Sequence, residues 1–140
     1  PDKLLKDRST IKLGNTELTL LSHPGHTKGS ASYLISVKDG NKTYKVLIAN
    51  LPSIVIDGKF SEVKAYPNIA KDYAYTFKAM KNLEFDLWVA SHASQFNLHK
   101  LRQPNDSSNP AIFGDKKAYF NNLNDLEKDY QEKLKEEVKK

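Results

Sequence analysis

Alternating polar and apolar positions in the first third of the chain predict four short β-strands. Glycine-containing turns at 14–16 and 38–41 would join these strands into two hairpins. Residues 46–48 are consecutive and apolar, which is typical of a strand covered on both faces. The four predicted strands are Thr10–Leu13, Glu17–Ser22, Ala31–Val37 and Tyr44–Ala49.

Apolar residues at helical spacing follow in the second half. One helix is predicted to begin at Pro67, because proline is favoured in the first helical turn. A longer helix is predicted over about 115–138, and a short strand, Asp86–Ala90, lies between the two. The apolar stripes of the two helices are Ile69, Tyr73, Phe77 and Met80, and then Tyr119, Leu123, Leu126, Tyr130, Leu134 and Val138. The order of elements predicts a mixed α/β fold in which each stripe packs into the core.

Composition narrows the function classes. A length of 140 residues suits one domain, and 39% hydrophobic residues argue against disorder. The absence of cysteine excludes disulfides, a cysteine nucleophile and thiolate zinc ligands. The net charge of +5 comes from interleaved signs, and the basic cluster of His99, Lys100 and Arg102 is short, so we expect no nucleic-acid binding. We also expect no membrane span, and a first residue of Pro1 suggests a processed or partial chain.

The four histidines are the candidates for chemistry: His23, His26, His92 and His99. His26 follows a predicted strand in a Pro-Gly loop, and His92 follows another, which is where α/β folds place ligand groups. Imidazole suits zinc, but even an open zinc site takes three protein ligands, and no HExxH or HxHxDH motif is present. The carboxylates Asp57, Glu62 and Asp72 have no predicted partners. Metal chemistry would therefore be incomplete in this chain, and polar loop histidines remain the alternative.

Four sequence stretches, two of which overlap, resemble a known family. Residues 23–30 (HPGHTKGS) resemble the third histidine motif of the metallo-β-lactamase superfamily, and residues 91–99 (SHASQFNLH) resemble its last one. The stretches 48–55 (IANLPSIV) and 66–96 are similar to the third subclass of class B β-lactamases, and within it to the GOB-type enzymes. The resemblance covers essentially all 140 residues, as the carboxyl-terminal half of the αββα fold.

The resemblance implies a function and a set of site residues. In the complete enzyme, zinc-bound hydroxide would open the ring amide of β-lactam antibiotics, and the protein would be periplasmic and confer antibiotic resistance. His26 and His92 would be metal ligands for one or two zinc ions, and the catalytic carboxylate would lie outside this chain. Leu51, where many relatives have serine and GOB-type enzymes methionine, and Ser53 would line the substrate pocket. Ala31 stands where the family often has cysteine.

Other readings remain open at this point. The histidine motif also fits another hydrolase of the superfamily, such as a thioesterase or lactonase, or a non-catalytic interaction half-domain. Residues 1–140 would form a half-domain. Without the amino-terminal half, this half-domain would expose one sheet face, including Leu18, Leu20 and 46–48. We therefore expect it to pair with that half, to dimerise, or to be unstable by itself, and to be inactive alone.

Overall fold

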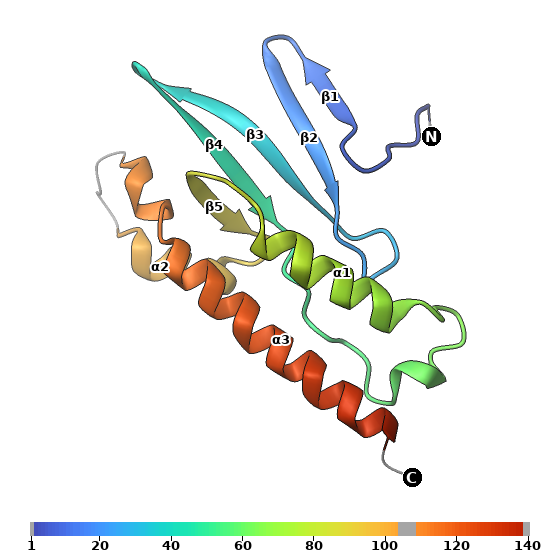
Figure 1. Cartoon of the computed structure of the whole chain (residues 1–140). Helices are drawn as coiled ribbons and strands as arrows, with labels where there is room; N and C mark the ends of the chain where they lie inside the picture. The colour runs from blue at the N-terminus through green and yellow to red at the C-terminus, as the bar shows by residue number, and fades with distance from the viewer. Residues whose placement is uncertain (1, 104–108, 139–140) are drawn as a thin grey trace.

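A five-stranded mixed sheet with helices against one face forms the fold (Figure 1). The computed structural model describes residues 2–103 and 109–138. The strands are β1 (Thr10–Leu13), β2 (Thr16–Ser22), β3 (Ala31–Asp39), β4 (Lys42–Ala49) and β5 (Leu87–Ala90). The helices are α1 (Ile69–Lys81), α2 (Leu98–Leu101) and α3 (Lys116–Val138), with short 3-10 turns η1 (Phe60–Glu62), η2 (Ala93–Phe96) and η3 (Pro110–Phe113).

The directions of the strands decide where the loops meet. The strand order is β1-β2-β3-β4-β5, with antiparallel pairs throughout except for the parallel pair β4–β5. A parallel pair needs a crossover connection, and α1 provides it. Because β2 and β4 are both antiparallel to β3, the strands β2, β4 and β5 all run the same way. Their carboxyl ends therefore lie at one edge of the sheet.

The helix-covered face holds the core. Leu21, Leu47, Ala49 and Trp88 are buried beneath α1 and α3, which pack against each other. The predicted stripe of α1 is fully buried, as are Tyr119, Leu123 and Tyr130 of α3. Leu126 and Leu134 are half-buried, whereas Val138 at the end of α3 is 83% exposed. The predicted core positions on the two helices are thus confirmed except at Val138. This residue lies at the very end of α3, beyond the elements that cover the rest of the stripe.

In the part of the chain that the structure describes, the opposite face of the sheet stays partly exposed over β2, β3 and β4. This open face carries Leu18 and Leu20 of β2, Tyr33 and Ile35 of β3, and Val46 and Ile48 of β4. Leu47 is 0% exposed, but its neighbour Ile48 is 37% exposed. The prediction that 46–48 are covered on both faces is therefore wrong for this chain, because no described element packs over the open face at Ile48. The prediction that these apolar positions meet solvent in a half-domain is confirmed at Ile48, whereas Leu18, Leu20 and Val46 are half-buried and Leu47 is buried on the other face.

Element boundaries differ from the prediction in places where turn geometry decides. The second hairpin is longer than predicted, because β3 and β4 continue pairing to Asp39 and Lys42. The helix α1 begins at Ile69 rather than Pro67, since Pro67 and Asn68 form a turn. The longer helix begins at Lys116, and Asp115 caps it by accepting the backbone N–H of Ala118 at 2.9 Å. The three 3-10 turns and α2 were not predicted, since each spans only three or four residues.

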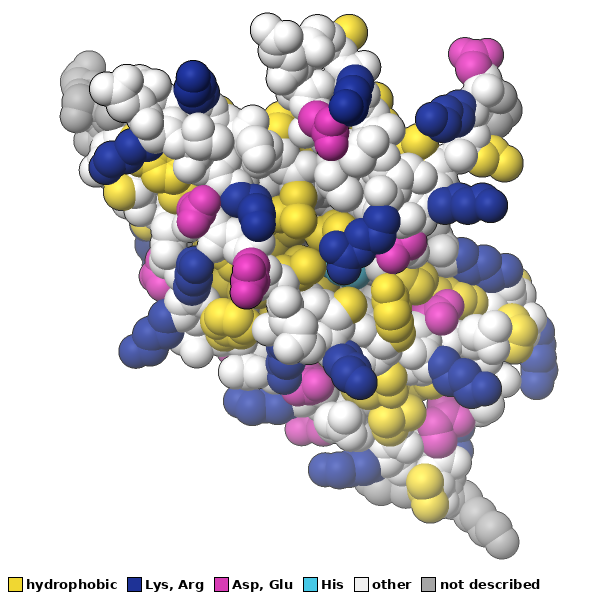
Figure 2. All heavy atoms as spheres, turned by 45° about the horizontal axis from the view of Figure 1, so that its top comes forward, with side chains coloured by type: hydrophobic (Ala, Val, Ile, Leu, Met, Phe, Trp, Pro, Cys, Tyr) yellow, Lys and Arg dark blue, Asp and Glu magenta, His cyan; other side chains and the backbone are white. Residues whose placement is uncertain are grey.

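Surface charge is mixed. Figure 2 shows Lys and Arg side chains interspersed with Asp and Glu around a central group of hydrophobic side chains. Such a surface differs from the one-signed patch typical of nucleic-acid binders. Within the described residues, no helix has the length and apolar character needed to cross a bilayer.

Candidate metal site

Three segments meet at the sheet edge where β2, β4 and β5 end. The loop 23–30 leaves β2, the segment 50–53 leaves β4, and the segment 91–95 leaves β5. Together they enclose a cavity of about 230 Å³, lined by His26, Asn50, Leu51, Ser53, Ser91, His92 and Gln95. The sheet thus brings four residues singled out in the sequence, His26, Leu51, Ser53 and His92, to the same cavity.

His26 is held by the segment that follows β4. Its Nδ1 lies 2.8 Å from the backbone carbonyl oxygen of Ser53 and 3.2 Å from the Ser53 hydroxyl. A carbonyl oxygen accepts and never donates, so the His26 proton sits on Nδ1 and the Nε2 lone pair is left for another partner. Metal-binding histidines in proteins commonly have this arrangement, in which a carbonyl fixes the tautomer of the ligating ring.

Helix α1 supports the same carbonyl from behind. The hydroxyl of Tyr73 donates to the Ser53 carbonyl oxygen at 2.9 Å, and Tyr73 is completely buried. Burial raises the pKa of Tyr73 to about 12, so its hydroxyl remains a donor at physiological pH. The Ser53 carbonyl therefore accepts from both Tyr73 and His26, which ties the loop, the segment 50–53 and α1 together. The helical spacing of Tyr73 predicts a place in the core but does not reveal this contact.

The loop 23–30 follows the surface of α1 closely. Gly25 has φ +136, and a Cβ added there would lie 2.8 Å from Cδ1 of Tyr73. This approach and this backbone angle both require glycine. The hydroxyl of Thr76 donates to the Pro24 carbonyl oxygen at 2.6 Å. The Pro-Gly turn is therefore fitted against α1, and this contact sets the direction in which His26 leaves the loop.

His92 lines the same cavity from the segment that follows β5. It is exposed and directly precedes η2, and its backbone N–H donates to Oε1 of Gln95 at 3.2 Å. The turn is anchored by Phe96, which is buried with its ring centroid 6.2 Å from that of Trp88. Asn50, Ser91 and Gln95 also line the cavity, and the sequence analysis did not select them, since no motif distinguishes them from other polar loop residues.

The other two histidines lie elsewhere. His23 is 3% exposed and its Nδ1 lies 2.7 Å from the hydroxyl of Ser32. Burial lowers the pKa of His23 to about 4, so it is neutral at physiological pH. His99 is exposed on α2 and does not line the cavity. Of the four histidines, His26 and His92 are thus the two that line this cavity.

The candidate carboxylates do not lie in this cavity. Asp57 and Glu62 are exposed, and Asp72 accepts a hydrogen bond of 2.6 Å from the hydroxyl of Tyr66. Among residues 2–103 and 109–138, no three His, Asp or Glu side chains lie together so that they could hold a metal ion. Among the described residues, two histidines line one cavity, which fits part of a zinc site and not a complete one.

A second cavity adjoins the first and opens on the uncovered sheet face. It measures about 380 Å³ and shares His26, Asn50 and Ser91 with the first. Its remaining lining includes Tyr33 and Ile48, which lie opposite each other on the open face. Any polypeptide that covers the open face at this end therefore reaches the histidine cavity.

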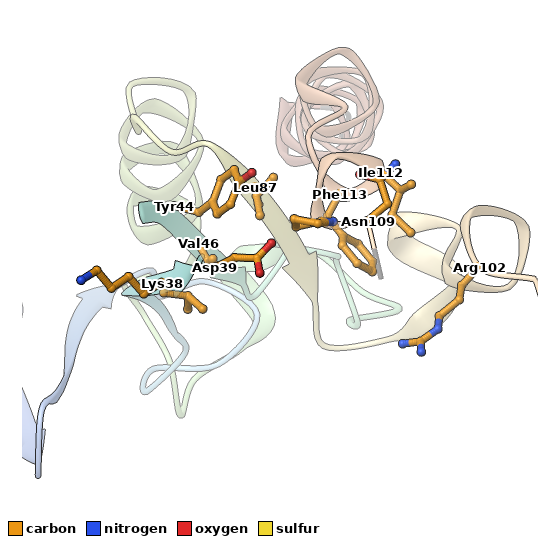
Figure 3. A pocket seen from close by; sticks show the side chains of 11 residues that line it. Lys38, Asp39, Tyr44, Val46, Leu87, Arg102, Asn109, Ile112 and Phe113 are labelled. Carbon is orange, nitrogen blue, oxygen red and sulfur yellow. The ribbon is translucent and has the colours of Figure 1, made fainter. Parts of the chain in front are cut away.

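A third cleft lies away from these residues. It measures about 330 Å³, and Figure 3 shows Tyr44 and Val46 on one side of it, with Ile112 and Phe113 on the other. Its lining includes Leu87 at the start of β5, the opposite end of that strand from His92. Because it contains neither cavity histidine, we assign the chemistry to the other end of the sheet.

Comparison with known proteins places the fold. No protein-family model matches the chain, and no curated protein matches it. Among solved structures, the metallo-β-lactamase GOB-18 from Elizabethkingia meningoseptica is 64% identical, with a TM-score of 0.94 over 96% of this chain and 50% of that one. The class B3 di-zinc metallo-β-lactamase LRA-12 from an Alaskan soil metagenome is 58% identical, with a TM-score of 0.92 over 95% and 50%. A β-lactamase from Chitinophaga pinensis is 51% identical, with a TM-score of 0.92 over 96% and 51%.

In sequence and in fold, this chain matches one half of a class B3 metallo-β-lactamase. The chain spans about half the length of the solved structures it matches. The resemblance and the fold class predicted from the sequence are confirmed. The roles of His26, His92, Leu51 and Ser53 stay predictions.

Proposed function

We propose that this chain is the carboxyl-terminal half of a zinc-dependent enzyme that hydrolyses β-lactam antibiotics. One observation carries the proposal. His26 and His92 lie far apart in the sequence, yet they line the same cavity. The chain that forms this cavity is 64% identical in sequence to GOB-18 over the matched half. We further propose that the complete protein acts in the periplasm, where it confers antibiotic resistance.

Four of the residues that line the cavity have a role in this proposal. His26 and His92 hold zinc, and the Ser53 carbonyl keeps the His26 proton on Nδ1 so that Nε2 faces the metal. Bound zinc would supply activation of a water molecule near neutral pH and stabilisation of negative charge on the substrate's carbonyl oxygen. Leu51, which is 3% exposed, forms an apolar wall for the substrate. Ser53 also lines the cavity, and in this proposal its hydroxyl contacts the substrate. No catalytic acid or base is assigned to this chain.

The remaining metal ligands come from the amino-terminal half in this proposal. That half packs on the open face and reaches the histidines through the 380 Å³ cavity. Covering Ile48 and its neighbours removes apolar surface from water, which contributes about 25 cal/mol per Å² to the association. Metal binding and the pairing of the two halves are therefore coupled, because each stabilises the same assembled state.

A hybrid enzyme tests the proposal. In this GOB-18 hybrid, residues 1–140 replace the matching half of GOB-18, so the complementary half is supplied by a protein of the same fold. We expect the hybrid to bind zinc tightly and to hydrolyse a chromogenic cephalosporin. The isolated chain should bind zinc weakly and show no hydrolysis, since among its described residues two ligands lie at the site.

Matched variants separate the assigned ligands from other histidines. His26→Ala and His92→Ala in the hybrid should each lose hydrolysis and weaken zinc binding, whereas His99→Ala, on exposed α2, should leave both unchanged. Hydrolysis of a thioester or lactone in place of the cephalosporin would overturn the β-lactam assignment. A folded hybrid without any zinc binding would favour an interaction half-domain instead.

A further inference from the structure

The loop 23–30 contains a second histidine that the proposed metal site does not use. His23 is 3% exposed and its Nδ1 lies 2.7 Å from Oγ of Ser32, which is itself completely buried. The same Ser32 oxygen accepts the backbone N–H of Asn50 at 2.9 Å. A chain of two hydrogen bonds therefore runs from the loop, through β3, to the residue that follows β4.

The directions of these hydrogen bonds determine where the protons are. The Asn50 backbone N–H is a donor, so the Ser32 oxygen accepts in that bond. Ser32 is completely buried, and among the described residues Nδ1 of His23 is the one partner that could accept its hydroxyl proton. Directing the proton to Nδ1 satisfies this buried hydroxyl and requires an unprotonated Nδ1. A neutral His23 consequently carries its proton on Nε2. His26, three residues later, has the opposite assignment, because its Nδ1 faces a carbonyl oxygen.

Both histidines act on the same four-residue segment. His23 reaches its first residue, Asn50, through Ser32, and His26 binds the carbonyl of its last residue, Ser53. Between them lies Leu51, which is buried and lines the cavity. If the Asn50 end of the segment shifted, the Ser53 carbonyl that orients His26 would shift with it.

We propose that His23 is a positioning residue, which holds segment 50–53 through Ser32 so that the Ser53 carbonyl fixes His26 in its metal-binding tautomer. The inference rests on the proposed function, since it takes His26 as a zinc ligand. The two histidines of the loop then have opposite neutral tautomers. His23 accepts at Nδ1 and stays away from the metal, and His26 donates at Nδ1 and presents Nε2 to it.

Nitrogen-15 NMR of the imidazole rings in the zinc-free GOB-18 hybrid tests the tautomers directly. We expect His23 to show an unprotonated Nδ1 and a protonated Nε2, and His26 to show the reverse. A protonated Nδ1 on neutral His23, or an unprotonated Nδ1 on neutral His26, would overturn the proposal. This readout needs neither a β-lactam nor bound zinc. An inactive hybrid with the expected tautomers would therefore refute the proposed function, and an active one with other tautomers would refute this inference alone.

Variants test the positioning role. His23→Asn keeps an acceptor close to the place of Nδ1, whereas His23→Leu removes it, and Ser32→Ala removes the shared oxygen. By analogy with residues that orient metal ligands, we expect His23→Leu and Ser32→Ala to weaken zinc binding by roughly 10- to 100-fold, measured by chelator competition. Both should also speed amide hydrogen exchange at Asn50. His23→Asn should keep zinc affinity and Asn50 exchange close to those of the parent.

The controls separate positioning from general loss of stability. His99→Leu changes an exposed histidine and should alter neither zinc binding nor Asn50 exchange. If His23→Leu does not fold, Ser32→Ala, which deletes one oxygen atom, provides the same two measurements. Unchanged zinc affinity and unchanged Asn50 exchange in a folded Ser32→Ala hybrid would contradict the proposal.

Discussion

Acid should destabilise this protein through His23, and the size of the effect follows from its burial. Burial lowers the pKa of His23 from its usual 6.5 to about 4 in the folded state and outweighs the charge of Asp7, which raises it; the charge of Arg8 lowers it slightly further. In the unfolded chain the ring titrates near 6.5, so between these two pH values the unfolded state binds more protons. The stabilisation from neutral His23 is thus complete above pH 6.5 and is lost as the pH falls to about 4.

The expected magnitude is about 3 kcal/mol, from a shift of roughly 2.5 pKa units at 1.36 kcal/mol each. His23→Asn removes the titrating ring and keeps a hydrogen-bond acceptor for Ser32. The variant should be less stable than the parent near neutral pH, because a smaller side chain leaves space in a buried site. Between pH 7 and pH 4, the free energy of unfolding of the parent should then fall by about 3 kcal/mol more than that of His23→Asn.

Urea unfolding of the zinc-free GOB-18 hybrid at several pH values, followed by far-ultraviolet circular dichroism, measures this difference. Comparing parent and variant cancels the titration of every group except His23. His99→Asn is the matched control, and its exposed ring should leave the pH dependence unchanged. If the parent and His23→Asn lose stability in parallel as the pH falls, His23 is not held neutral by burial and the reasoning fails.

Three further substitutions test the packing around the site and the open face. Gly25→Ala should lower the free energy of unfolding by about 3 kcal/mol in the same urea assay, because Gly25 has φ +136 and lies close to Tyr73. The control Gly14→Ala has open space around it and should lower the free energy of unfolding by about 1 kcal/mol. Tyr73→Phe removes the hydroxyl that donates to the Ser53 carbonyl and should lower the free energy of unfolding, measured by thermal unfolding, by about 1 kcal/mol. Tyr75→Phe, on an exposed ring, should lower it by less than about 0.5 kcal/mol. Ile48→Lys on the open face should reduce self-association of the isolated chain in sedimentation, and unchanged association would show that another surface mediates it.

Local pattern was sufficient for most of the secondary structure. Hairpin turns and helical stripes depend on neighbours within a few residues, so β1, β2, α1 and α3 could be predicted close to their observed bounds. The 3-10 turns could not, because so short an element carries no periodicity. The exposed Ile48 illustrates a different limit. A run of apolar residues indicates that a strand is suited to burial on both faces, but not whether the covering polypeptide belongs to the same chain.

The candidate site was harder to predict from residue spacing. The positions of His26 and His92 in loops after strands predict that they are candidate ligands. Nothing between them in the sequence indicates that they share a cavity. Likeness to a family suggested it, and the common direction of β2, β4 and β5 provides the physical reason. The support of the Ser53 carbonyl by Tyr73 has no signature in the sequence, because a tyrosine on an apolar helical stripe is usually explained by packing alone.

By itself, the sequence determined which segments become strands and helices, that cysteine chemistry is excluded, and that histidine is the residue type available for a metal. It did so because propensity, periodicity and side-chain chemistry are local properties. The tertiary structure alone decided that two histidines three residues apart have different environments. His23 is turned into the core against Ser32, and His26 is turned into a cavity against Ser53, because α1 and the ends of three parallel-running strands fix the path of the loop between them.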